Sequence, residues 1–141
     1  MREELSRILY QRYPSIFVHF LLPDAEKKGY KIWCQDGWFD LINTLCEQLE
    51  YWSSARNAPQ YVVLDVKEKL GALRFSGRYK SAEQIGALKM AYAMSTRLCE
   101  TCGAPGRLVV DVCRIMTRCE QHTPEGSIVI AENERRKYTI C

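Results

Sequence analysis

Two pairs of residues that bind metals lie in the C-terminal third of the chain. Cys99 and Cys102 are two residues apart in LCETCGAPG, and Cys119 and His122 have the same spacing in RCEQH. Zinc prefers four tetrahedral ligands, which are often cysteine sulfurs and histidine nitrogens. A C-x2-C pair lets two sulfurs turn toward one ion. Gly103, next to the second cysteine, suits a tight turn with positive φ. The pattern predicts a structural Zn²⁺ site with three cysteines and one histidine.

Other kinds of site use similar cysteine patterns. A C-x-x-C redox pair normally opens a helix after a strand, whereas this pair follows a predicted helix. A nucleobase deaminase needs an H-x-E motif upstream, and the only upstream histidine, His19, is followed by Phe20 and Leu21. Cys113 lies between the two pairs and could replace one ligand, although the apolar stretch VVDVCRIM favours a buried thiol there. Whether the zinc site responds to redox conditions stays open at this point.

Cysteine number and composition indicate the class of protein. The chain of 141 residues has 47% hydrophobic and 26% charged residues, which is typical of a globular domain. Its seven cysteines are an odd number and follow no signal peptide, which favours a reducing compartment over a disulfide framework. The longest apolar run, IFVHFLL, is far shorter than the ~20 residues that cross a bilayer. We therefore expect a cytoplasmic protein.

The elements that must position the cysteines begin with two helices. The first is expected over residues 2–13, before Pro14. The second is expected to begin at Asp36 as N-cap, because apolar residues then recur every three or four positions as far as Trp52. The polar stretch SSARNAPQ, residues 53–60, is expected to form a loop.

A β-hairpin and a third helix follow. The hairpin turns at Leu70-Gly71, and alternation places one set of residues toward the core: Val62, Leu64, Val66, Leu73 and Phe75. Ser81 and Gln84 form a capping box that starts a helix over 82–98. Its apolar side is expected to contain Ile85, Leu88, Tyr92 and Ser95, broadened by Ala87, Ala91, Met94 and Leu98.

The predicted fold class is α+β, with about three helices packed on a small antiparallel hairpin or sheet. Strands are expected in RLVVDV and in the tail SIVIAENERRKYTI. We divide the chain into an α+β domain over 1–98 and a zinc-ribbon- or knuckle-like lobe over 99–141. The lobe is expected to pack on the domain as one compact unit.

Basic residues are concentrated in the middle of the chain. Alternation places Lys67, Lys69 and Arg74 on the hairpin face opposite the apolar set, with Arg78 and Lys80 just beyond. This face is either an ordinary solvated surface or a contact for phosphates or an acidic partner. The pI of about 8.5 is below the value of about 9 expected for dedicated nucleic-acid binders.

The sequence contains no coherent catalytic set. His19 lies in an apolar run and is expected to pack in the core or at an interface. Cys34 is a conceivable nucleophile, but no histidine is evident to activate it. A closed four-ligand zinc site leaves no position for substrate. These observations predict a protein that is not an enzyme.

Several stretches together resemble small uncharacterised proteins of tailed phages and prophages. They are WCQDGWFDLINTLCEQLE, VKEKLGALRFSG, AYAMSTRLCETCGAPGRL and TRCEQH, which together span residues 33–122. The family pattern is C-G-D-G-W-F, V-K-E-K-F-G-G-L-R-F, C-E-x-C-G and C-x-x-H. Gln35, Leu70 and Ala72 depart from it, while the Cys and His positions match one for one. The resemblance implies a viral accessory protein that acts in the bacterial cytoplasm.

Two functions remain open from the sequence. The first is a zinc-stabilised protein that binds a macromolecular partner, with a host protein such as a restriction or CRISPR-type defence factor favoured. The alternative is nucleic-acid binding through the basic hairpin face, which would weaken steeply with salt because phosphate contacts release counterions. The oligomeric state and the identity of the partner do not follow from the sequence.

Overall fold

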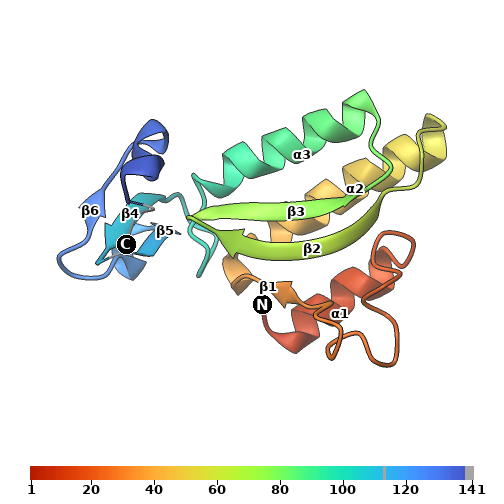
Figure 1. Cartoon of the computed structure of the whole chain (residues 1–141), viewed down its shortest axis with the longest axis horizontal. Helices are drawn as coiled ribbons and strands as arrows, with labels where there is room; N and C mark the ends of the chain where they lie inside the picture. Colours follow the sequence, from red (N-terminus) through yellow and green to blue (C-terminus); the bar gives the residue numbers. More distant parts are fainter. Residues whose placement is uncertain (113, 139–141) are drawn as a thin grey trace.

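The computed structural model describes residues 1–112 and 114–138, and its fold is α+β, as predicted. Three helices and a three-stranded sheet form the larger part, and a second three-stranded sheet belongs to the C-terminal lobe (Figure 1). The lobe lies at the end of the molecule where the hairpin turns. The helices are α1 (Glu3–Arg12), α2 (Phe39–Ala55) and α3 (Ala82–Ser95).

The first sheet has the order β1-β2-β3. Strands β2 (Val62–Lys69) and β3 (Ala72–Arg78) are antiparallel and joined at Leu70-Gly71, as predicted. The two turn residues have φ of 54° and 76°, a left-handed pair typical of tight hairpins. Strand β1 (Ile32–Trp33), which the sequence did not indicate, pairs with β2 in parallel.

The inward-facing set of β2 differs from the prediction. Val63 and Val66 are fully buried, while Val62 and Leu64 are only half-buried. A register shift between Val63 and Asp65 inserts an extra residue, which changes the strict alternation on which the prediction relied. Phe75 is buried opposite Val66, as expected.

Two of the predicted helix boundaries are wrong. Asp36 does not cap α2, because a short 3-10 helix (Asp36–Trp38) precedes it and the Asp36 carboxylate accepts hydrogen bonds from Arg2 instead. Helix α2 also continues through the first residues of the expected loop, to Ala55. The capping box is confirmed, since Ser81 accepts from Gln84 N and Gln84 Oε1 accepts from Ser81 N.

The buried side of α3 matches the prediction only in part. Ala91 and Ser95 of the expected side are buried, and so is Gln84, which was not expected there. Three other residues of the expected side, Ile85, Tyr92 and Met94, are exposed, as is Met90. The buried Gln84 amide donates to Pro59 O and Ser53 Oγ, and the Ser95 hydroxyl accepts from Leu73 N. These bonds satisfy polar groups that face the sheet and α2. Apolar side chains are therefore left on the outer surface of the helix.

The C-terminal lobe has the strand order β5-β4-β6. Strands β4 (Arg107–Asp111) and β5 (Arg114–Arg118) form a hairpin, and β6 (Ile128–Val129) pairs with β4. Thr117 Oγ1 donates to Gly71 O at 2.6 Å, and a Cβ on Gly71 would lie 2.6 Å from Leu108. The tip of the first hairpin therefore contacts the lobe directly. A 3-10 segment (Glu132–Tyr138) adds a hydrogen bond from Arg135 to the Tyr92 hydroxyl of α3.

Candidate metal centre and its surroundings

The four predicted ligands come from two turns. Cys99 and Cys102 lie in a turn that follows α3, in which Gly103 has a φ of 77° and donates to Cys99 O at 2.8 Å. Cys119 follows β5, and His122 lies in a 3-10 helix (Glu120–His122). The β4–β5 hairpin returns the chain to the first turn, so the structure brings the four residues together.

The ligand atoms have the spacing of a metal site. All four lie within 4.8 Å of one another. The sulfurs of Cys102 and Cys119 are 3.7 Å apart, and His122 Nδ1 lies 3.7 Å from the Cys99 sulfur and 3.2 Å from the Cys119 sulfur. A tetrahedron with Zn–S bonds of about 2.3 Å has S–S edges of about 3.8 Å. The arrangement therefore fits a tetrahedral ion.

The same distances argue against a disulfide. A disulfide joins two sulfurs at about 2.05 Å, far less than the 3.7 Å between Cys102 and Cys119. The described cysteines of the cluster are all free thiols. Cys113, the alternative ligand, lies outside the described residues.

The environment of Cys99 favours the thiolate that a metal requires. Burial opposes ionisation of this thiol, but backbone hydrogen bonds from Cys119, Cys102 and Thr101 lower its pKa to about 6. Cys99 and Cys119 are buried, whereas Cys102 is exposed. The cluster thus has a protected side and a side open to solvent.

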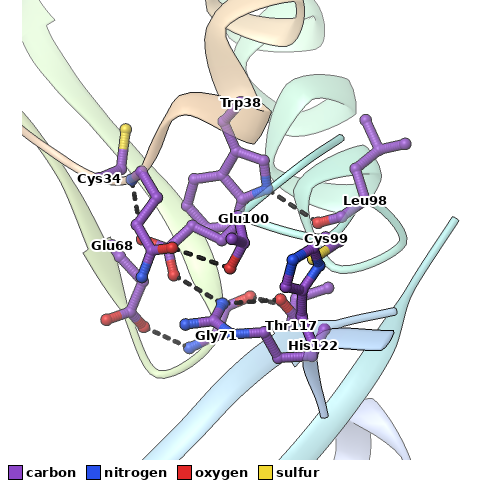
Figure 2. Close-up of polar contacts among 12 residues, drawn as sticks. Cys34, Trp38, Glu68, Gly71, Leu98, Cys99, Glu100, Thr117 and His122 are labelled. Carbon is purple, nitrogen blue, oxygen red and sulfur yellow. Dashed lines mark hydrogen bonds and ion pairs between the residues drawn. The ribbon is translucent and has the colours of Figure 1, made fainter. Parts of the chain in front are cut away.

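The segment QDGW (residues 35–38) packs against the turn that carries Cys99 and Cys102, which we call the cysteine turn. Gly37 N donates to Glu100 O at 2.8 Å, and Trp38 Nε1 donates to Leu98 O at 2.9 Å (Figure 2). Thr101 Oγ1 donates to Gln35 Oε1 at 2.8 Å. Hydrogen bonds from the N-terminal part of the chain therefore orient the backbone that carries two ligands, as outer-shell contacts do in metal sites. Sequence spacing gave no sign of this contact.

A buried ion pair lies beside the cluster. Glu100 and Arg118 are both buried, and Arg118 Nη1 lies 3.0 Å from Glu100 Oε2. The other carboxylate oxygen accepts from Gln35 N at 3.1 Å, and Arg118 also donates to Thr117 O. The pair connects the cysteine turn, strand β5 and the QDGW segment.

The basic hairpin face exists but is partly neutralised. Lys67 and Arg74 are direct cross-strand partners, and Asp65 forms ion pairs with both, at 2.9 and 3.5 Å. Asp65 is two residues from Lys67, so alternation alone could have placed it on this face. Lys69, Arg78 and Lys80 are exposed around it.

The sequence prediction also missed Trp33. It is 57% exposed and lies opposite Lys67 in the parallel register of β1 and β2, with Lys31 Nζ 5.5 Å from its ring centre. Trp33, Lys67 and Arg74 therefore form one row across three strands. Only the pairing of β1 with β2 brings the tryptophan to this face.

Cys34 is buried, and His19 packs on an aromatic ring. Burial raises the pKa of Cys34 to about 12, so its thiol is protonated near neutral pH. The His19 ring stacks on Tyr30 with centres 5.1 Å apart. Both positions are explained by packing.

An apolar groove lies between α2 and α3, on the outer surface where apolar side chains of α3 are exposed. Its volume is about 390 Å³, and its lining includes Leu41 and Leu45 of α2 and Ala87, Met90, Ala91 and Met94 of α3. Met90 is 64% exposed and Met94 38%. We call this feature the α2/α3 groove. It has few polar lining residues, of which Asp40 is the only charged one among those described.

Comparison of the chain with protein-family models, curated proteins and solved structures returned no match. The resemblance to phage proteins therefore stays a prediction. Within residues 1–112 and 114–138, none of the helices combines the length and apolar character that crossing a membrane requires.

Proposed function

We propose that this chain is a zinc-stabilised, non-catalytic protein that binds a protein partner through the α2/α3 groove. The observation that carries the proposal is the groove itself. Exposed apolar surface that is contiguous and bounded by polar residues marks interaction sites on soluble proteins. Methionine side chains are flexible and polarisable, which suits a surface that must adapt to another protein.

The Cys/His cluster supports stability in this proposal. Three thiolates and one imidazole favour Zn²⁺ over harder cations such as Mg²⁺ and Ca²⁺. With all four positions taken by protein, the ion would hold the cysteine turn, β5 and the QDGW segment in place and perform no reaction. The resemblance to phage proteins directs the search for the partner to host proteins of the bacterial cytoplasm, including defence factors.

A photo-crosslinking experiment tests the proposal. A benzoylphenylalanine residue replaces Met90 in the zinc-loaded chain, and in the control chain it replaces Ile85, which is on the other side of α3. We expect position 90 to form a protease-sensitive product with a defined protein in bacterial lysate, and position 85 to form none. Equal products at the two positions, or none at position 90, would contradict the proposal.

Nucleic-acid binding is the second candidate, and the row of Trp33, Lys67 and Arg74 favours it. An exposed aromatic ring can stack on a base while neighbouring cations contact phosphates. The ion pairs with Asp65 reduce the positive charge on this face, which is why we place it second. Binding of a labelled single strand should fall steeply with salt and should be lost on replacing Lys67, Lys69 and Arg74 with Glu. Binding that changes with neither the salt concentration nor these three substitutions would eliminate this candidate.

A further inference from the structure

We infer that the occupant of the α2/α3 groove is an amphipathic helix with basic residues beside its apolar stripe. The inference rests on the proposed function and adds the chemistry of the partner.

The residues that line the groove have the spacing of a helix-binding site. Ala87, Met90, Ala91 and Met94 follow one another at three- and four-residue intervals, so they form a stripe of about two helical turns along α3. Leu41 and Leu45 form the facing stripe on α2. The small side chains of Ala87 and Ala91 let another backbone approach closely, and the two methionines beside them can adjust to its side chains. Helix-in-groove recognition uses this arrangement.

The helices that form the groove carry an excess of negative charge. Helix α2 has three acidic residues and no basic one, and α3 has one of each, although the whole chain has a formal charge of +3. Asp40 lines the groove, and Glu47 is exposed two turns further along the same side of α2. Within the described residues neither carboxylate is in an ion pair. They are therefore available to lysine or arginine side chains of a partner.

The same charges disfavour a second copy of this chain as the occupant. Two copies that packed groove to groove would bring Asp40 and Glu47 toward the same residues of the other copy. Like charges brought together at an interface cost free energy. A partner with basic residues gains from the same two carboxylates.

Fluorescence anisotropy with designed peptides tests the inference on the full zinc-loaded chain. The probe is a labelled peptide of about 18 residues with leucines at helical spacing and lysines elsewhere. In the first control probe, glutamates replace the lysines. The second control probe has the residues of the leucine–lysine probe in scrambled order. We expect saturable binding of the leucine–lysine probe, and affinities weaker by at least about tenfold for both controls at about 0.15 M salt.

Variants locate the binding. Met90→Lys should weaken the leucine–lysine probe by at least about tenfold, whereas Ile85→Lys, on the same helix, should change its affinity less than about twofold. The double change Asp40→Lys and Glu47→Lys should shift the preference toward the leucine–glutamate probe. Thermal unfolding of each variant shows that the fold is intact.

Several results would overturn the inference. They are equal affinity for the lysine and glutamate probes, equal effects of Met90→Lys and Ile85→Lys, or no saturable binding. A dimer in sedimentation equilibrium that Met90→Lys dissociates would identify a second copy as the occupant instead. If Met90→Lys abolishes the binding of a nucleic acid, the occupant of the groove is a nucleic acid instead. If the probes fail but position 90 still crosslinks to a protein, the helix inference falls and the proposed function stands.

Discussion

The α-carbon of Gly37 lies against the backbone carbonyl of Cys99, so closely that a Cβ at position 37 would lie 2.4 Å from that oxygen. The same Cβ would lie 2.4 Å from Gly103 N and 2.5 Å from Cys102 N. These neighbours are backbone atoms of the turn that holds two candidate ligands. The fit of the N-terminal part to the cysteine turn therefore depends on the absence of a side chain at position 37.

Gly37→Ala should lower the free energy of unfolding by about 1–3 kcal/mol, the usual cost of overpacking a tight contact. It should also weaken metal binding, because the turn must move. Urea unfolding and zinc competition with a colorimetric chelator measure the two effects. Gly86→Ala is the matched control, since nothing lies within 4 Å of its Cβ in α3. That change should stabilise the helix by about 0.5–1 kcal/mol.

Removal of any one ligand should release the metal. Cys99→Ser, Cys102→Ser, Cys119→Ser and His122→Gln each leave three donors, and we expect zinc content measured by mass spectrometry to fall well below one per chain. Chelation of the native chain should lower its melting temperature for the same reason. Cys113→Ser is predicted to retain one zinc per chain. Loss of zinc in that variant, with retention in one of the other four, would show that Cys113 is a ligand.

Arg118→Met should destabilise the protein by about 3–5 kcal/mol, because it leaves the buried Glu100 carboxylate without its cation. Changing both residues, Glu100→Gln with Arg118→Met, should cost less than Arg118→Met alone. Chemical unfolding of the two single variants and the double variant measures this coupling. The exposed pair of Glu3 and Arg7 is the control, and Arg7→Met should cost less than about 1 kcal/mol. Equal costs at the two sites would contradict the burial of the first pair.

Stability should decrease in alkali. Burial raises the pKa of Cys34 from 9.0 to about 12 and that of Tyr10 from 10.0 to about 12. Their contribution is fully present below about pH 9. It is lost as the pH rises toward about 12, because the unfolded chain releases these protons first. Unfolding of the zinc-saturated chain measured from pH 8 upward, at steps of about half a unit, should show this decline.

Cys34→Ala separates the contribution of the thiol from general alkaline effects. The variant loses packing at every pH, but its stability should decline less steeply between about pH 9 and 11 than that of the parent. The native Cys34 thiol should also react slowly with iodoacetamide at neutral pH, because it is buried and protonated. An identical pH slope in parent and variant would show that the thiol does not titrate as described.

Features that depend on neighbouring residues follow from the amino-acid sequence. The hairpin turn at Leu70-Gly71, the capping box of Ser81 and Gln84 and the α+β class each follow from short-range spacing. The gathering of Cys99, Cys102, Cys119 and His122 also followed, because two short pairs need only one hairpin between them to meet. These patterns are local, so no knowledge of distant contacts was needed to predict them.

Contacts between distant segments are visible only in the folded chain. The contact of Gly37 with Cys99, the pairing of Glu100 with Arg118 and the place of Trp33 beside Lys67 join residues far apart in sequence, and no periodicity records them. The orientation of α3 was decided in the same way. Its hydrophobic residues lie on more than one side, so spacing predicted a stripe that is only partly buried. In the folded chain Gln84, Ala91 and Ser95 are buried, and Met90 and Met94 are left at the surface, where the α2/α3 groove forms.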